Sequence, residues 1–233
     1  GGEEPIELSI ELNEGWNWFS YNVEVEDNSI SNILESLGDN ALFIASQSSG
    51  IATNYEEYGW GGSLEELSAT EMYKINMSTS ATLIITGMPV DVASTPISLA
   101  SGWNWIGYLP QNPGDLNTAL ASVSESAIFI ASQSSGISSN YGDYGWQGSL
   151  ATLEPGSGYL LNMNAPGELV YPEFDGLTRM IAENKQKVVL SKTISDWYFN
   201  YADYEFIGTI TASIENRDDG DGDVVGVFVN GQC

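Results

Sequence analysis

The chain of 233 residues has no histidine, a single cysteine and only six basic side chains. Without histidine it has no imidazole general base, no histidine metal ligand and no Ser-His-Asp triad. The single cysteine, Cys233, is the last residue, so intrachain disulfides and zinc–thiolate clusters are excluded as well. These absences remove a large part of known catalytic and metal-dependent chemistry.

Charge of one sign dominates the composition, because 32 acidic side chains against 6 basic ones give a formal net charge of −26. Such a chain repels phosphate, which argues against nucleic acid and anionic membranes as partners. No stretch approaches the roughly 20 apolar residues of a membrane span, so we expect no membrane insertion. Hydrophobic residues still make up 42% of the chain, which is enough to build packed cores.

The few basic residues are unevenly placed. Lys74 is the single basic residue up to Asp175, and the other five lie in the last quarter of the chain. This change in composition predicts a domain boundary. The chain opens Gly1-Gly2-Glu3-Glu4 without a starting methionine, so we expect a processed product or a fragment. Low lysine with high acidity, Gly, Ser, Asn and Thr fits an exported protein.

One module occurs twice. The spacing is 87 residues from Trp16 to Trp103 and 86 residues from Trp60 to Trp146. The recurring segments are Gly15-Trp16-Asn17-Trp18 with Gly102-Trp103-Asn104-Trp105, Phe43 to Ile51 with Phe129 to Ile137, Asn54-Tyr55 with Asn140-Tyr141, Tyr58-Gly59-Trp60 with Tyr144-Gly145-Trp146, Gly62-Ser63-Leu64 with Gly148-Ser149-Leu150, and Tyr73 and Asn76-Met77 with Tyr159 and Asn162-Met163.

Each copy predicts the same order of elements. An opening strand is followed by a short helix, a buried strand, a Gln-Ser-Ser-Gly turn, an aromatic loop and closing strands. The ranges are Ile6 to Val25 and Ile97 to Leu109 for the opening strands, Ile30 to Leu37 (capped by Asp27-Asn28-Ser29) and Leu116 to Val123 (capped by Asp115) for the helices, Ala41 to Ala45 and Ala127 to Ala131 for the buried strands, Met72 to Met77 and Ala81 to Gly87 for closing strands of the first copy, and Met88 to Pro96 for the linker.

We therefore expect a mainly β fold with one short helix per repeat, built as two tandem homologous modules followed by a partial β-sandwich. The expected boundaries are 1–92, 93–173 and 174–233.

This pattern resembles the GWN-type repeats of exported marine bacterial proteins and marine virus virion proteins. In that family a Gly-Trp-Asn strand precedes a Gly-Trp-x-Gly-Ser-Leu segment and a Pro-Gly-x-Gly-Tyr turn. The second copy has the full turn, Pro155 to Tyr159, whereas the first reads Ala69 to Tyr73, so we expect its turn to be less tight. The resemblance covers about residues 6 to 172 and implies a building block of larger proteins.

The last sixty residues resemble the start of a β-sandwich module of Bacteroidetes surface proteins secreted by the type IX route. The resemblance rests on Asp196-Trp197, Tyr204-Glu205-Phe206 and Val224 to Cys233. Two or three strands alone leave unpaired edges. Either the domain continues beyond Cys233, or these strands complete a sheet with a neighbouring chain by strand addition.

An acidic segment follows in the same region. Oxygen ligands at alternate positions around glycines suit calcium, although no glutamate closes the loop as in an EF-hand. The alternative is an acidic hairpin turn, since Asp-Gly is a favoured turn dipeptide. The candidate calcium ligands are Asn216, Asp218, Asp219, Asp221 and Asp223.

The repeated aromatic residues suggest a carbohydrate site in each repeat, because aromatic rings stack on sugars while amides bond the hydroxyls. The alternative is that Trp and Tyr form the core and that the Gln-Ser-Ser-Gly segment pins its loop. For Trp16, Trp18 and their copies we expect core positions. The candidate carbohydrate-binding residues are Gln47, Asn54, Tyr58, Trp60, Gln133, Asn140, Tyr144 and Trp146.

A glycosidase needs two carboxyl groups roughly 5 to 9 Å apart. The repeat supplies one matched pair, Glu57 and Asp143, in different copies. We therefore expect no enzyme. Asn76-Met77-Ser78 is a formal N-glycosylation sequon, relevant only in a eukaryotic source or host.

The sequence thus predicts a non-catalytic extracellular or virion-surface protein of structural or adhesive function, such as a spacer, fibre or appendage component. The alternatives are a carbohydrate-binding module, which attaches to cell-surface or matrix polysaccharide, and an accessory fragment of a large secreted enzyme or adhesin.

Overall fold

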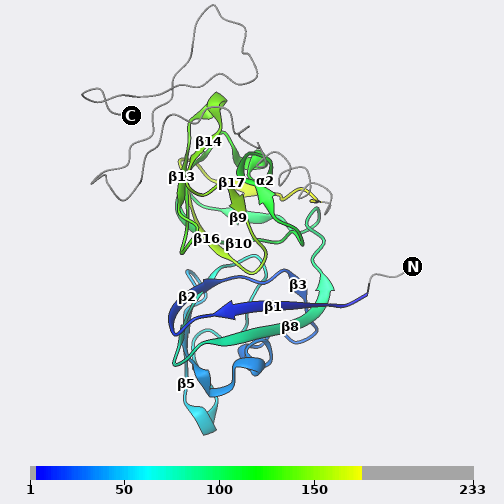
Figure 1. Cartoon of the computed structure of the whole chain (residues 1–233), viewed down its shortest axis with the longest axis vertical. Coiled ribbons are helices and arrows are strands. Elements are labelled where there is room, and N and C mark those ends of the chain that lie inside the picture. The colour runs from blue at the N-terminus through cyan, green and yellow to red at the C-terminus, as the bar shows by residue number, and fades with distance from the viewer. Residues whose placement is uncertain (1–3, 175–233) are drawn as a thin grey trace, which may run out of the picture. The chain divides into compact units, whose positions relative to one another are not determined.

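The structure is a computed structural model that describes residues 4–174. It is mainly β, with five small antiparallel sheets, and this confirms the expected fold class. The partial β-sandwich and all five candidate calcium ligands lie outside the described residues. In Figure 1 the first repeat runs from blue to cyan and the second from green to yellow.

The first repeat contains a five-stranded sheet in the order β2-β7-β4-β5-β6 and a three-stranded sheet in the order β1-β8-β3. A short helix and two 3₁₀ helices connect the strands. The elements are β1 (Ile6–Leu12), β2 (Gly15–Phe19), β3 (Val23–Glu24), α1 (Ile30–Ile33), η1 (Glu35–Asn40), β4 (Ala41–Ala45), β5 (Ile51–Asn54), η2 (Glu56–Tyr58), β6 (Trp60–Gly62), β7 (Tyr73–Met77) and β8 (Ala81–Pro89).

The second repeat rebuilds the five-stranded sheet in the equivalent order β10-β16-β12-β13-β14. The pair β9–β17 stands in place of the pairing of β1 with β8, and the pair β11–β15 stands where the first repeat has only the isolated bridge between Ser29 and Glu66. The elements are β9 (Ile97–Leu99), β10 (Gly102–Gly107), β11 (Gly114–Asp115), α2 (Leu116–Ala119), η3 (Ala121–Val123), β12 (Ala127–Ser132), β13 (Ile137–Asn140), η4 (Gly142–Tyr144), β14 (Trp146–Gly148), β15 (Thr152–Leu153), β16 (Gly158–Met163) and β17 (Gly167–Leu169).

The predicted helix caps are confirmed. The Ser29 hydroxyl accepts a hydrogen bond from the backbone N–H of Asn32 at 3.4 Å, and the Asp115 carboxylate accepts one from Thr118 at 3.1 Å. Both α-helices are shorter than expected because each turns into a 3₁₀ helix after four residues.

The prediction of one continuous opening strand is wrong in both repeats. The chain turns at Gly15, whose φ of +85° favours glycine, so that β1 pairs with β8 while β2 pairs with β7. The Asn17 side chain closes this turn: it accepts from Asn13 N at 2.8 Å and donates to the Asn13 and Gly15 carbonyls at 2.7 and 3.0 Å. Gly102 and Asn104 repeat the arrangement, which gives the Gly-Trp-Asn motif its structural reason.

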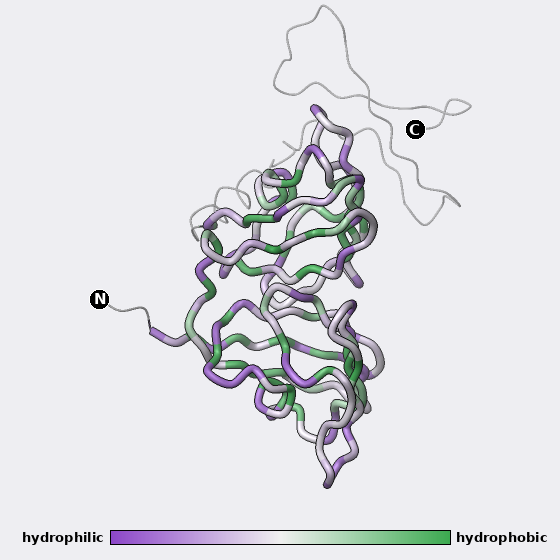
Figure 2. The backbone as a smooth tube through the Cα atoms, turned by 180° about the vertical axis from the view of Figure 1, so that it is seen from behind, coloured by the Kyte–Doolittle hydropathy of each residue, from purple (hydrophilic) through white to green (hydrophobic). Residues whose placement is uncertain are grey.

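Each repeat has its own hydrophobic core, on the inner face of its five-stranded sheet. Phe19, Ile44 and Ile75 belong to the first core. The predicted linker between the repeats is packed rather than free, because Val90 and Val92 are buried in the second core. Figure 2 shows hydrophobic segments running through both repeats.

The expectation that Trp16 and Trp18 form the core is wrong. They lie on one face of β2, as alternation predicts, but Asn17 and Phe19 occupy the core-facing positions. Trp16 is 52% exposed and its copy Trp103 is 47% exposed. Trp18 and Trp105 are half-buried. The expectation of a less tight turn over residues 69–73 is also wrong, because the turn-closing bond from Glu71 N to the Ser68 carbonyl is 3.2 Å long, against 3.3 Å for the equivalent bond from Ser157 N to the Glu154 carbonyl. In both repeats a tyrosine hydroxyl adds a bond to the turn: Tyr73 accepts from Ser68 N at 2.7 Å, and Tyr159 accepts from Glu154 N at 2.8 Å.

Candidate functional site

The two glutamines of the repeated Gln-Ser-Ser-Gly turns hold the repeats together. Gln133 accepts a hydrogen bond from the Trp18 backbone N–H at 2.6 Å and donates one to the Trp16 carbonyl at 2.6 Å. Gln47 of the first repeat makes the equivalent pair of bonds to the second repeat. It accepts from the Trp105 N–H at 2.7 Å and donates to the Trp103 carbonyl at 2.6 Å. Each repeat therefore donates the same motif to the other, which is the contact pattern of a twofold dimer.

These bonds cover strand edges. β2 and β10 are the edge strands of their five-stranded sheets, so one side of each lacks a neighbouring strand. The carboxamide of glutamine offers one N–H donor and one C=O acceptor, which is what an unpaired peptide unit presents to its neighbour. Gln47 and Gln133 therefore act like a short additional strand and protect edges that otherwise invite pairing with another chain.

Backbone contacts flank the glutamines with the same reciprocity. Phe19 forms an isolated antiparallel bridge with Ser157, and Ile106 forms the equivalent bridge with Glu71. Asn22 adds a bond without a counterpart, from its amide to the Pro110 carbonyl at 2.9 Å.

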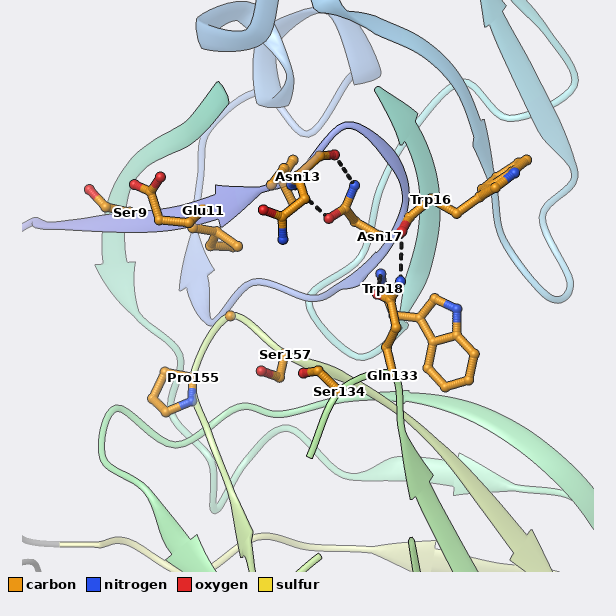
Figure 3. Close-up of a pocket in the computed structure, with 13 residues that line it drawn as sticks. Ser9, Glu11, Asn13, Trp16, Asn17, Trp18, Gln133, Ser134, Pro155 and Ser157 are labelled. Atoms are coloured by element: carbon orange, nitrogen blue, oxygen red, sulfur yellow. Dashed lines mark hydrogen bonds between the residues drawn. The ribbon is translucent and has the colours of Figure 1, made fainter. Parts of the chain in front are cut away.

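Two clefts flank this junction at equivalent positions. One, of about 520 Å³, lies between β1 and β2 of the first repeat and the Gln133 and Gly156 turns of the second. The other, of about 640 Å³, has the same arrangement with the repeats exchanged. Figure 3 shows the first cleft: Gln133 reaches the backbone of β2, while the indoles of Trp16 and Trp18 point away from Ser9 and Ser157.

Lys74, the one basic residue among the 22 charged residues of 4–174, lies at the junction. Its ammonium group is 4.8 Å from the centroid of the Trp18 ring and 4.2 Å from that of Trp105. Burial lowers the pKa of Lys74. The cation therefore joins one indole from each repeat through cation–π contacts, which stabilise by about 0.5–2 kcal/mol each.

Asn54 and Asn140, both candidate carbohydrate ligands, bond the backbone instead. The Asn54 amide donates to the Gly38 and Ala41 carbonyls at 3.3 and 3.0 Å and accepts from Glu56 N at 3.0 Å. Asn140 makes the equivalent three bonds. These amides fix the aromatic loop.

The remaining candidates do not share one surface with the glutamines. Trp146 is 7% exposed within the second core, and Trp60 is half-buried against the first. Tyr58 and Tyr144 lie at loop tips, 91% and 84% exposed. Tyr58 and Tyr144 therefore lie in the aromatic loops, whereas Gln47 and Gln133 lie at the junction, so these candidates do not form one binding site. Glu57 and Asp143 lie exposed in the loops of different repeats.

A different set of aromatic side chains forms a surface. The outer face of the first sheet carries Trp16 on β2, Asn76 on β7 and Phe43 on β4, in one row of paired residues. Trp103, Asn162 and Phe129 form the same row in the second repeat. Sequence reasoning missed this face. The alternation of β7, in which Lys74 and Asn76 are half-exposed between buried neighbours, carries the signal, but it identifies Trp16 only once β2 is known to pair with β7.

In residues 4–174 no group of three or more His, Cys, Asp or Glu side chains is arranged to hold a metal ion. The helices of this part are also too short to cross a membrane. Comparisons with protein-family models, with curated proteins and with solved structures give no match for the chain.

Proposed function

We propose that the chain is a non-catalytic structural or adhesive component of an extracellular or virion surface, with the two repeats acting as one block. The reciprocal bonds of Gln47 and Gln133 carry this proposal. The most alike parts of the two repeats serve to fix the backbone and to join the repeats, rather than to gather reactive groups in one pocket. A non-catalytic role agrees with the absence of histidine from the chain.

Charge supports a surface role. Residues 4–174 contain 21 acidic side chains and one basic side chain, so copies of this block repel one another and stay soluble. The joined repeats resist separation because each contributes two hydrogen bonds to the other. A block of this kind suits a spacer or a presenting element.

Two experiments test the proposal. Antibodies against the full chain should label intact, unpermeabilised source cells or particles. Beads coated with the full chain should adhere to matrix-coated surfaces under shear, and beads coated with the Gln47→Ala/Gln133→Ala variant should detach at lower force because the weakened junction yields under a smaller load. Labelling only after permeabilisation would contradict the proposal, as would turnover of a substrate by the purified chain.

A further inference from the structure

The outer faces of the two five-stranded sheets carry no acidic side chain, although the described part of the chain has 21. Strand pairing and alternation place these residues outward. They are Trp16, Trp18, Lys74, Asn76, Phe43, Ala45, Ile51, Thr53 and Gly61 in the first repeat, and Trp103, Trp105, Leu160, Asn162, Phe129, Ala131, Ile137, Ser139 and Gln147 in the second. We call each set an outer face.

The most exposed tryptophan on each outer face is held in a fixed orientation. Trp16 packs edge-to-face on Phe43, with ring centroids 5.8 Å apart and an interplanar angle of 78°. Trp103 packs on Phe129 in the same way, at 5.7 Å and 84°. Because a phenyl ring supports each half-exposed indole, little conformational entropy is lost when a ligand stacks on it.

An amide stands beside each of these rings. Asn76 pairs with Trp16 on one side and with Phe43 on the other, and Asn162 occupies the equivalent position. Within residues 4–174 neither side-chain amide makes a hydrogen bond to another residue. Each has donors and an acceptor available beside an apolar ring, the combination that orients a ligand having both apolar and hydroxyl groups.

The two outer faces meet at the junction, because Lys74 contacts Trp18 of one and Trp105 of the other. A ligand that spans both therefore needs length. A polyanion does not suit these faces, since the surrounding carboxylates repel it and a single lysine, already enclosed by two indoles, offers little attraction. The outer faces also lack a carboxylate that could pair with a cationic sugar, so they favour a neutral ligand.

We propose that the outer faces together bind a neutral polysaccharide, with sugar rings stacked on Trp16 and Trp103 and hydroxyl groups bonded by Asn76 and Asn162. The proposal rests on the adhesive function above and names its ligand. One polysaccharide molecule that occupies both outer faces binds with avidity, so the loss of either tryptophan weakens binding strongly.

The test uses the full chain, made in a bacterial host so that Asn76 stays unmodified, on an array of neutral polysaccharides (laminarin, mannan, dextran, agarose) and anionic ones (alginate, carrageenan). We expect binding to a neutral polysaccharide, with affinity reduced about tenfold or more in Trp16→Ala and in Trp103→Ala, and abolished in the double variant. The matched control is Tyr58→Ala/Tyr144→Ala, which removes two exposed rings outside the outer faces and should bind as wild type.

Near-ultraviolet circular dichroism and thermal melting establish that each variant is folded, and Asn76→Ala/Asn162→Ala gives a second probe of the same faces. Binding only to anionic polysaccharides, unchanged binding by the folded double variant, or no binding to any neutral glycan would overturn the proposal. The proposal would also be overturned if the wild-type protein self-associated in sedimentation analysis and Trp16→Ala/Trp103→Ala abolished that association. The outer faces would then bind a second copy of the protein. None of these outcomes alters surface labelling, which tests the adhesive function separately.

Discussion

At the junction the two repeats differ although their motifs are the same. Ser20 of the first repeat stands where the second has Gly107, and Lys74 stands where the second has Leu160. The Ser20 hydroxyl donates to the Ser157 carbonyl at 2.7 Å and accepts from Tyr108 N at 3.1 Å. At the equivalent position Gly107 leaves room for the Ala69 carbonyl.

The difference teaches what duplication permits. In a homodimer, a residue near the twofold axis lies close to the same residue of the other subunit. Lys74 contacts both Trp18 and Trp105, and Leu160 pairs with Trp105 on the next strand. A lysine at position 160 would bring a second cation to the same indoles, where like charges destabilise. Two linked repeats avoid this because each can carry a different residue.

The largest expected effect is alkaline unfolding, with the second repeat affected more. Burial raises the pKa of five tyrosines: Tyr21 and Tyr73 in the first repeat, and Tyr108, Tyr159 (to about 12) and Tyr171 in the second. Their stabilisation is complete below the ordinary pKa of 10.0. It is lost as pH rises, because the unfolded state then releases protons that the folded state keeps, at about 1.4 kcal/mol per tyrosine and pH unit.

Amide hydrogen exchange along a pH series above 10, followed separately in each repeat, checks this. The second repeat should lose protection at lower pH, and Tyr171→Phe should reduce the difference. The lowered pKa of Lys74 acts with the opposite sign, adding stability as pH rises, but it is one group against five. If the first repeat lost its protection from exchange at a lower pH than the second, the prediction would be wrong.

Gly107→Ala should separate the repeats while leaving each folded. A Cβ at this position would lie 2.2 Å from the Ala69 carbonyl oxygen, a backbone atom of the other repeat. Overpacking of this kind costs about 2–3 kcal/mol. The control is Gly61→Ala, where the nearest atom is the exposed Tyr55 ring at 3.1 Å. Small-angle scattering and urea unfolding should detect a looser, less stable block only for Gly107→Ala; equal effects would argue against a tight junction.

Asn17→Ala and Asn104→Ala should destabilise their own repeats by similar amounts, about 1–2 kcal/mol each, because each removes the hydrogen bonds that close the turn and leaves partly buried backbone groups without a protein partner. Urea unfolding measures this, and Asn17→Asp serves as a control that keeps the acceptor for Asn13 N but loses the donors. If Asn17→Ala alone were destabilising, the turn closure would not be a shared property of the repeats.

The smallest effects concern the glutamines. Gln133→Ala should speed hydrogen exchange at the Trp18 amide and leave Trp105 protected, whereas Gln47→Ala should do the reverse, each at a cost of about 1 kcal/mol. Gln→Glu variants retain the acceptor and should give slower exchange than Gln→Ala. Unchanged exchange at both amides would remove the evidence for reciprocal edge capping.

Much of the fold follows from the sequence. The duplication, the mainly β composition, the Ser29 and Asp115 caps and the positions of β4 and β7 are local or periodic properties, so neighbouring residues suffice to predict them. The turn at Gly15 is not predicted, because apolar and polar residues alternate along much of the segment from Ile6 to Val25 and this pattern does not reveal a single positive φ.

The sites depend on more. Trp16 and Trp60 were assigned from residue type, and the structure reverses the expected exposure of Trp16 because the pairing of β2 with β7 decides which face of the strand meets the core. Gln47 is predicted to act with Asn54, Tyr58 and Trp60, which are close to it in sequence, whereas in the structure it bonds Trp105, 58 residues away.

The sequence by itself determined that this chain is an acidic, duplicated, mainly β protein without histidine chemistry, because composition and repetition need no contacts to be recognised. Only the tertiary structure decided that the shared motif joins the two repeats and that each outer face presents an exposed tryptophan packed on a phenylalanine. Both properties depend on which residues distant in sequence meet, and strand pairing and repeat docking fix those meetings through hydrogen bonds and burial.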